Sequence, residues 1–435
     1  MKNFIKNKTA ASLLSAVYLF VAFVVFGCNT KDDVTSVFDS KNIGNRPTPH
    51  IDSFEAVNGE YAKLAGVGVI RIHGQNFSEV KEENLVQFND KKGTVLSATS
   101  TALEVQVPYL ASDTITVQIS VQKALQYSNK ITMSLQDPCV LLMSDKFQNA
   151  RSLAVDASNN VYACIADDKG VNKGIVKYDP TTKKYVTFAG TSVSIKTWSA
   201  MKFSADGSLY VVGPERRIAV VSPTGGAVSS FVTFATSEGV TMLNDFDFDS
   251  QKNIWTGGVV TTSKIYSASP AKVVTAFPFT GEVHAIRVFN NYLYIAVNRN
   301  NVEQIVKMKI NSNTSLGSEE KVFEVGDKAP ADTKISSFTF ASDGYMYVGL
   351  TQAPGILVVS PNGLSYENYY PSVLQPSSIY GKYSGFAWDS NTFLYAIQDK
   401  QAKDKDASGN DITITISQLV KINTLKMSAP YYGKN

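Results

Sequence analysis

From about residue 150 to residue 425, apolar runs and polar turns alternate in a unit that occurs six times. Each unit has an apolar strand, a turn of Asp, Asn or Gly, a second strand centred on an aromatic residue, a polar loop and a third strand. The six central aromatic residues, 39 to 53 positions apart, are Tyr162, Tyr210, Trp255, Tyr294, Tyr347 and Tyr395. Small sheets with this period bury their faces only against neighbouring sheets. The pattern therefore predicts a six-bladed β-propeller.

The first strand of each unit is expected to be the innermost strand of its blade. These strands are Ser152–Val155, Ala200–Phe203, Asp245–Phe248, Ala285–Val288, Ser337–Phe340 and Gly385–Trp388. The central aromatic residues recur at one blade position, so we expect them to pack between blades. Two short segments, Val140–Met143 and Lys426–Gly433, could each supply the outer strand that closes the ring, and the sequence leaves this choice open.

Residues 47–136 show strict apolar and polar alternation in several short runs, with turn residues about every ten positions. The runs are Val69–Ile72, Leu85–Phe88, Leu103–Val107 and Ile115–Val121. This alternation predicts a small β-sandwich. Because Pro138 ends the preceding strand, we place the boundary of the propeller, residues 137–435, at this point.

The amino terminus carries Lys2, Lys6 and Lys8, then an almost wholly apolar stretch over residues 10–26, and then Cys28. This order resembles a bacterial lipoprotein signal peptide, which implies removal of residues 1–27 and lipidation of Cys28. A plain membrane anchor helix is the alternative. Residues 29–33, Asn-Thr-Lys-Asp-Asp, resemble the surface-export signal of Bacteroidota lipoproteins. We expect a lipid-anchored, surface-exposed outer-membrane protein with a flexible tether over residues 28–46.

The charge balance and the residue composition bear on which partners, metals and cofactors are expected. The chain has 41 basic and 38 acidic residues, and without the three amino-terminal lysines the two numbers are equal. A neutral body gives no electrostatic reason to expect a nucleic-acid partner. The three histidines lack ligand spacing, so we expect no metal site, and no cofactor or catalytic motif is evident. Whether Cys139 and Cys164 pair is left open.

Two resemblances are more specific. Residues 49–54, 72–78, 86–89, 103–108 and 128–129 together look like an IPT/TIG domain, a class of immunoglobulin-like sandwich. The repeats resemble NHL-type propellers. The first resemblance implies a spacer or protein-contact module, so we interpret the sandwich as a stalk for the propeller. The second specifies the fold and says little about function.

A propeller presents variable residues at one mouth of its central channel. Loops that enter the inner strands would place there Arg151, Trp198, Asn244, His284, Ser336 and Tyr383, and loops between second and third strands would add Arg216, Arg299 and Gln352. Aromatic rings beside amides, hydroxyls and charges suit a sugar, because its apolar face stacks while its hydroxyls form hydrogen bonds. Trp198 precedes an inner strand and is the strongest candidate, although it could equally cover the core.

Two metal alternatives arise from the residues. Asp245, Glu282 and His284 could converge as in lactonase-like or lyase-like propellers. Residues 404–411 imitate the opening of a calcium loop, but Thr415 stands where a bidentate Glu belongs, which favours a long polar hairpin.

The preferred hypothesis is a non-enzymatic surface lipoprotein that binds a glycan or glycoconjugate through the propeller mouth, beside outer-membrane nutrient-uptake proteins. The order of parts is similar to that of such lipoproteins. The alternatives are a protein-interaction scaffold in the envelope and a metal-dependent lactonase or lyase.

Overall fold

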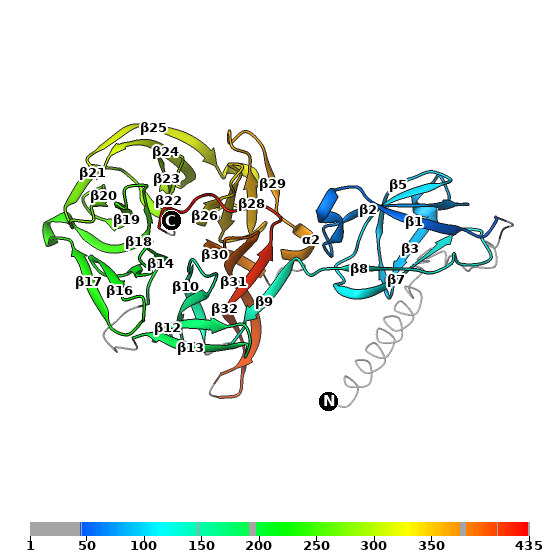
Figure 1. The fold of residues 1–435 in the computed structure, drawn as a ribbon, viewed down its shortest axis with the longest axis horizontal. Helices are drawn as coiled ribbons and strands as arrows, with labels where there is room; N and C mark the ends of the chain where they lie inside the picture. The colour runs from blue at the N-terminus through cyan, green and yellow to red at the C-terminus, as the bar shows by residue number, and fades with distance from the viewer. Residues whose placement is uncertain are drawn as a thin grey trace, which may run out of the picture.

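The computed structural model describes Gly44 and residues 46–145, 148–190, 197–374, 380–406 and 408–433. The expected signal peptide, Cys28 and nearly all of the expected tether lie outside these residues. A β-sandwich is followed by a ring of six sheets (Figure 1), which confirms the all-β fold class with an immunoglobulin-like sandwich and a six-bladed propeller. Within the described ranges, no helix has the length and apolar character needed to span a bilayer.

The sandwich consists of two antiparallel sheets whose alternating strands turn their apolar sides toward each other. One sheet has the order β1 (His50–Ala56), β2 (Val69–Gln75), β6 (Ala102–Gln106), β5 (Thr94–Ala98), and the other β4 (Lys91–Lys92), β3 (Asn84–Phe88), β7 (Ser112–Val121), β8 (Ile131–Leu135). Two 3-10 helices, η2 (Gly59–Lys63) and η3 (Lys81–Glu83), lie in the connections. Ile72, Phe88 and Leu103 are fully buried between the sheets.

Each blade of the propeller is a sheet of four antiparallel strands. The strands are given from the innermost outward. Blade 1 consists of β10 (Asn149–Val155), β11 (Val161–Ala166), β12 (Asn172–Asp179) and β13 (Lys184–Ala189). Blade 2 consists of β14 (Ala200–Phe203), β15 (Leu209–Val212), β16 (Arg217–Val221) and β17 (Val228–Thr233), and blade 3 of β18 (Val240–Phe248), β19 (Ile254–Val260), β20 (Lys264–Ala268) and β21 (Val274–Pro278). Blade 4 consists of β22 (Glu282–Phe289), β23 (Tyr292–Arg299), β24 (Val302–Ser312) and β25 (Ser315–Glu324). Blade 5 consists of β26 (Ile335–Phe340), β27 (Met346–Leu350), β28 (Ile356–Val359) and β29 (Tyr366–Asn368). Blade 6 consists of β30 (Tyr380–Trp388), β31 (Phe393–Lys405), β32 (Asp411–Asn423) and, as its outermost strand, β9 (Cys139–Met143). Short helices η4 (Thr236–Glu238), η5 (Gly326–Lys328) and α2 (Pro371–Leu374) lie between strands. Successive innermost strands pack on one another, and β30 returns to β10, so the ring is closed.

The central aromatic residues pack across the blade boundaries, as the repeat predicted. In four places the ring of one blade meets an aromatic ring on the inner strand of the next blade: Tyr162–Phe203 at 4.8 Å, Tyr210–Phe248 at 5.4 Å, Tyr294–Phe340 at 4.8 Å and Tyr347–Trp388 at 5.5 Å between centroids. Such edge-on pairs each contribute about 0.5–1.5 kcal/mol beyond their buried area. The repeat therefore encodes the contacts between blades as well as the strands within them.

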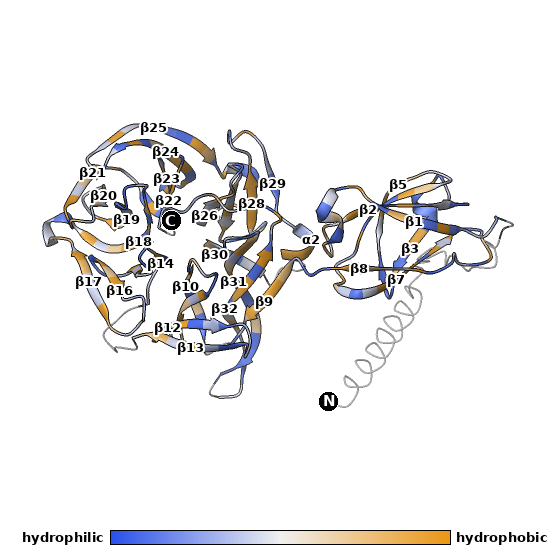
Figure 2. Ribbon diagram, in the orientation of Figure 1, coloured by the Kyte–Doolittle hydropathy of each residue, from blue (hydrophilic) through white to orange (hydrophobic). Residues whose placement is uncertain are grey.

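The ring is closed by the segment that precedes the propeller repeats. Strand β9 pairs with β32, with Cys139 opposite Ile422 and Met143 opposite Leu419, and so completes blade 6. Figure 2 shows β9 as a largely apolar strand and the tip of the β31–β32 hairpin as hydrophilic. Cys139 and Cys164 are both free thiols, and burial raises the pKa of each to about 12.

The carboxyl-terminal residues have a different role. They cross one face of the propeller and end at the centre of the ring (Figure 1). On the way, Ser342 N donates to Met427 O at 2.8 Å, and Ala429 N donates to Phe340 O at 3.1 Å. The last described residues therefore cover one end of the central channel.

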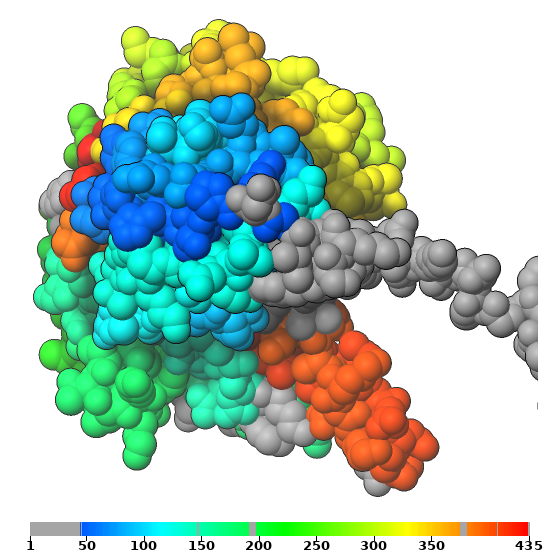
Figure 3. Space-filling model, turned by 90° about the vertical axis from the view of Figure 1, so that its right-hand side faces the viewer, coloured from blue at the N-terminus to red at the C-terminus, as the bar shows by residue number. Residues whose placement is uncertain are grey.

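The sandwich packs against the side of the propeller (Figure 3). Leu64, directly after η2, is 1% exposed and belongs to the same apolar cluster as Tyr347 and Trp388. The hydroxyl of Tyr61 donates to the carbonyl of Thr424 at 3.2 Å. A cavity of about 460 Å³ lies beside this contact and is lined by residues of both domains.

Candidate functional site

The starts of the innermost strands surround a cavity of about 390 Å³ at the open end of the channel, which we call the mouth cavity. Of the residues expected there from the loops that enter the inner strands, five line the cavity: Arg151, Trp198, Asn244, His284 and Ser336. They come from blades 1, 3, 4 and 5 and from the segment leading into blade 2. The structure therefore brings together side chains that are far apart in the sequence.

Tyr383 does not line the mouth cavity. Its side chain is fully buried, and its hydroxyl donates to the carbonyl of Leu374 at 2.6 Å. Its neighbours Lys382 and Ser384 line the cavity instead. The register between β30 and β31 shifts on both sides of this position, and such irregularities change which side chains face a given surface.

Trp198 reaches the cavity wall, but its ring lies in the core. The side chain is 2% exposed and packs with Met201 and Leu209, and the guanidinium of Arg217 lies 5.8 Å from the ring centroid. The carbonyl of Trp198 accepts a hydrogen bond from Ser152 Oγ at 2.8 Å, which links blade 1 to the start of blade 2. The indole has almost no surface available for stacking on a sugar in this structure.

The three residues predicted from the loops between second and third strands lie outside the lining of the mouth cavity and hold outer loops in place. They are Arg216, Arg299 and Gln352. Arg216 Nη1 donates to Phe234 O and Thr236 Oγ1, both at 2.9 Å. Arg299 forms a two-pronged ion pair with Glu319, with its Nη2 2.8 Å from the carboxylate. Gln352 Nε2 donates to Ala331 O at 3.4 Å.

Polar residues at the mouth also join neighbouring blades. Asn244 Nδ2 of blade 3 donates to Val283 O of blade 4 at 2.6 Å. Behind the wall, Glu303 accepts hydrogen bonds from Asn298 Nδ2 at 2.6 Å and from Ile335 N at 3.1 Å, and its Oε1 lies 3.4 Å from His284 Nε2. Burial by itself would raise the pKa of Glu303, but the contacts with His284 and Asn298 outweigh it and hold the pKa below its ordinary value.

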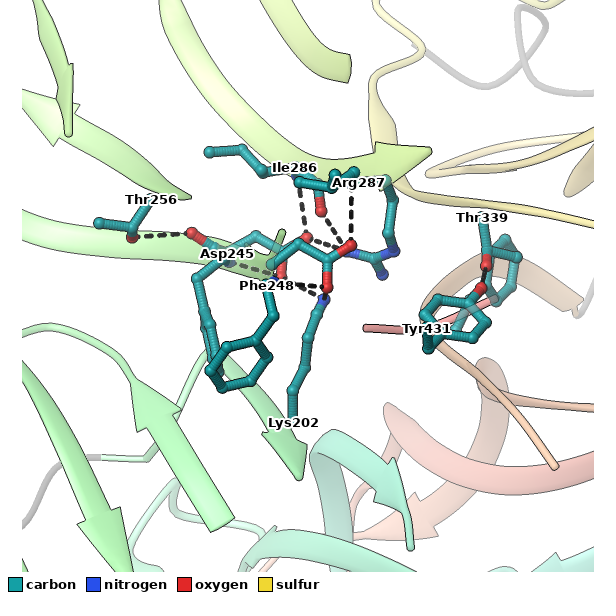
Figure 4. A network of polar contacts seen from close by, with 12 residues as sticks. Lys202, Asp245, Phe248, Thr256, Ile286, Arg287, Thr339 and Tyr431 are labelled. Carbon is teal, nitrogen blue, oxygen red and sulfur yellow. Dashed lines mark hydrogen bonds and ion pairs between the residues drawn. The ribbon is translucent and has the colours of Figure 1, made fainter. Parts of the chain in front are cut away.

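Below the mouth, four charged side chains from three inner strands meet in the channel wall (Figure 4). Asp245 Oδ2 lies 2.5 Å from Arg287 Nη1, and Lys202 Nζ lies 3.4 Å from Asp245 Oδ1 and 3.9 Å from Asp247 Oδ1. Both carboxylates also accept backbone N–H groups of blade 4, from Ile286 at 3.0 Å and from Val288 at 2.9 Å. We call these four residues, Lys202, Asp245, Asp247 and Arg287, the channel charge cluster.

Burial and pairing act differently on the members of this cluster. Burial would raise the pKa of Asp245, but the charges of Arg287 and Lys202 outweigh it and lower the pKa. Burial dominates at Asp247, whose pKa is raised, and at Lys202, whose pKa is lowered by burial and by Arg287. The cluster carries two positive and two negative groups when all four are ionised, so its members balance one another.

The far end of the channel is filled by the carboxyl-terminal segment. The hydroxyl of Tyr431 is hydrogen-bonded to Thr339 Oγ1, which also accepts from Trp388 Nε1 at 3.1 Å (Figure 4). A Cβ at Gly433 would lie 2.4 Å from Phe203 O, so only glycine fits at this position. The space left inside the channel is about 90 Å³.

The two metal alternatives are not assembled in the described residues. Asp245 is paired with Arg287, Glu282 is exposed, and the described parts of the chain contain no group of three His, Cys, Asp or Glu side chains placed to hold a metal. Residues 404–411 form the polar end of the β31–β32 hairpin, as predicted, with Ala407 outside the described residues. There, Asp406 accepts from the backbone N–H groups of Ser408 and Asn410.

Comparison with known proteins agrees with this architecture. Residues 49–135 match the IPT/TIG domain, so the first domain belongs to the family indicated by its sequence. No curated protein matches the chain.

Several solved structures are similar to this chain. A Bacteroides thetaiotaomicron protein described as a candidate phosphatase has a TM-score of 0.52 and 11% identity, covering 88% of this chain and 99% of its own. An auxiliary nutrient binding protein of the same species has a TM-score of 0.47 and 11% identity, covering 87% and 98%. The calcium-binding protein regucalcin of Agrobacterium tumefaciens has a TM-score of 0.48 and 9% identity, covering 67% and 95%. At 11% identity, the similarity to the first of these structures bears on the fold alone.

Proposed function

We propose that this chain is a carbohydrate-binding protein and that the ligand occupies the mouth cavity. The observation that carries the proposal is the cavity itself. Its volume of about 390 Å³ lies within the range of about 300–1,000 Å³ typical of small-ligand sites. Its lining residues include Thr197, Thr351 and Ser384, which carry hydroxyls, and Asn244, which carries an amide. Hydroxyls and amides both donate and accept, which matches the hydroxyl groups of a sugar.

The proposal is binding without turnover. The channel carboxylates Asp245 and Asp247 are engaged by Lys202 and Arg287 and by backbone N–H groups. The charge of Asp245 is already stabilised in the ground state and its pKa is lowered, so this carboxylate is a poor proton donor or nucleophile. The tail around Tyr431 fills the opposite end of the channel, so the ligand would enter and leave through the mouth.

We further propose that Cys28 anchors the protein to the outer membrane, with the two domains facing outward beside a nutrient-uptake system. The sequence before the first domain supports this: an apolar segment ends at Cys28 and is followed by a polar stretch suited to a tether. In this setting the mouth would hold glycans near the cell surface.

The test is affinity gel electrophoresis of the full chain in non-ionic detergent against a panel of polysaccharides. Ser384→Trp should fill the mouth cavity and abolish retardation, whereas Ser229→Trp, an exposed site on the outer strand β17, should leave it unchanged. Absence of retardation by every polysaccharide would overturn the proposal and favour the scaffold hypothesis. Release of shortened sugars during incubation would replace it with an enzymatic function.

A further inference from the structure

The side chains around the mouth cavity have an unbalanced charge. Arg151 of blade 1, Lys334 just before blade 5 and Lys382 of blade 6 all line it, and none of its described lining residues is an Asp or Glu. The whole chain has 41 basic and 38 acidic residues, so a random set of its charged residues would contain both signs. The rim of the cavity is therefore a local concentration of positive charge, contributed by three separate parts of the chain.

These three cationic groups also lack partners among the residues that the structure describes. Within the described ranges, no ion pair or side-chain hydrogen bond involves the guanidinium of Arg151 or the ammonium groups of Lys334 and Lys382. Elsewhere on the propeller, comparable side chains are paired, such as Lys173 with Asp167 at 3.0 Å. Arg151 and Lys334 are exposed and Lys382 is half-buried, so all three can reach a ligand.

Two carboxylates next to lining residues of the cavity, Glu303 and Asp245, are already engaged by other groups. Glu303 lies behind His284 and accepts hydrogen bonds from Asn298 and Ile335. Asp245 lies deeper in the channel and is paired with Arg287. The three cations therefore make the electrostatic potential in the cavity positive, because the surrounding protein is less polarisable than water and screens them less.

We propose that the mouth cavity binds an anionic carbohydrate, a sugar that carries a carboxylate or a sulfate group. This inference rests on the proposed function and specifies its ligand class. The cations would form charge-assisted hydrogen bonds to the anion, with Arg151 able to contact two oxygens at once. The hydroxyls and the amide of the lining would contact the neutral hydroxyls of the same sugar.

The experiment compares polysaccharides that differ in charge alone. The full chain in detergent is run in gels containing polygalacturonate or its methyl-esterified form, and κ-carrageenan or its chemically desulfated form. The first pair tests a carboxylate and the second a sulfate ester. We expect retardation by one charged polymer and at least tenfold weaker retardation by its neutral counterpart, because a charge-assisted hydrogen bond is worth about one decade in affinity.

Variants locate the effect. Arg151→Gln, Lys334→Gln and Lys382→Gln should each weaken binding about three- to tenfold, and the triple variant should lose the preference for the charged polymer. Lys184→Gln, an exposed lysine on the outer strand β13, is the matched control and should bind as the unmodified protein does.

The outcomes separate the two proposals. Equal binding of charged and neutral polymers, lost in Ser384→Trp, would overturn the anionic inference and leave carbohydrate binding intact. No binding of any polymer would overturn both. Equal binding of a single-stranded nucleic acid, or equal weakening by Lys184→Gln, would show general attraction of polyanions and overturn the anionic inference.

Discussion

Removal of Asp245 should destabilise the propeller strongly. The variant Asp245→Leu leaves the charges of Arg287 and Lys202 in the channel wall with Asp247 as their only counter-charge in the cluster. At an effective dielectric constant of about 20, the contact with Arg287 at 2.5 Å and that with Lys202 at 3.4 Å correspond to about 7 and about 5 kcal/mol of Coulomb attraction. The cost of burying the carboxylate, several kcal/mol, is also removed, so the net loss should be about 3–5 kcal/mol.

The assay is equilibrium urea unfolding followed by tryptophan fluorescence. The three tryptophans, Trp198, Trp255 and Trp388, all lie in the propeller and are at most 2% exposed, so the signal reports this domain and not the sandwich. Arg287→Met tests the partner. In the double variant, Lys202 and Asp247 again balance each other, so the loss should fall at least about 2 kcal/mol short of the sum of the single losses.

Two results would refute this reasoning. A loss below about 1 kcal/mol for Asp245→Leu would show that the carboxylate is not needed to balance the buried cations. Additive single and double variants would show that Asp245 and Arg287 do not act as a pair.

Three other variants test separate features. In the folded protein the pKa of Glu303 lies below its ordinary value of 4.5, so its ionised form stabilises the fold above that pH, and the contribution is lost as pH falls through the lowered pKa. Glu303→Gln should therefore lower the urea midpoint at pH 7, and its difference from the parent protein should shrink as the pH is lowered below 4.5. A pH-independent difference would contradict this. Trp198→Ala should cost about 3–5 kcal/mol in the same unfolding assay, as expected for a core indole, and a loss of sugar binding at unchanged stability would contradict its burial. Leu64→Ala should loosen the contact between the domains and accelerate proteolysis near Pro138, whereas the exposed control Leu125→Ala should not.

The blades could be predicted from the sequence because their packing repeats. Tyr162, Tyr210, Tyr294 and Tyr347 mark equivalent positions, and each meets the next blade in the same way. The strand that closes the ring could not be chosen, because Val140–Met143 and Lys426–Gly433 are both short and their partners are distant in sequence. Only the pairing of β9 with β32 distinguishes them.

The mouth was predicted in part. Arg151, Asn244 and His284 follow from the rule that loops entering the inner strands form the rim. Tyr383 was misplaced relative to the cavity because the strand register shifts around it, which the sequence does not show. Lys334 and Lys382 were missed because the overall charge balance hides a local excess.

The channel charge cluster had a signal in the sequence that was not used. Lys202, Asp247 and Arg287 occupy the third position of three successive inner strands, where the other strands carry Ala or Thr. A period of two puts this position on one face of every strand. Polar residues repeated there indicate side chains that meet in the channel.

The position of β9 in blade 6 has a consequence for biogenesis. The outer strand of the last blade is synthesised first, and it remains without its partner until β32 has been made at the other end of the propeller. Any blades that form before β32 is available therefore belong to an open arc with a free edge. Pairing across nearly the whole domain makes loop closure slow, and the open arc is the form most exposed to aggregation or cleavage.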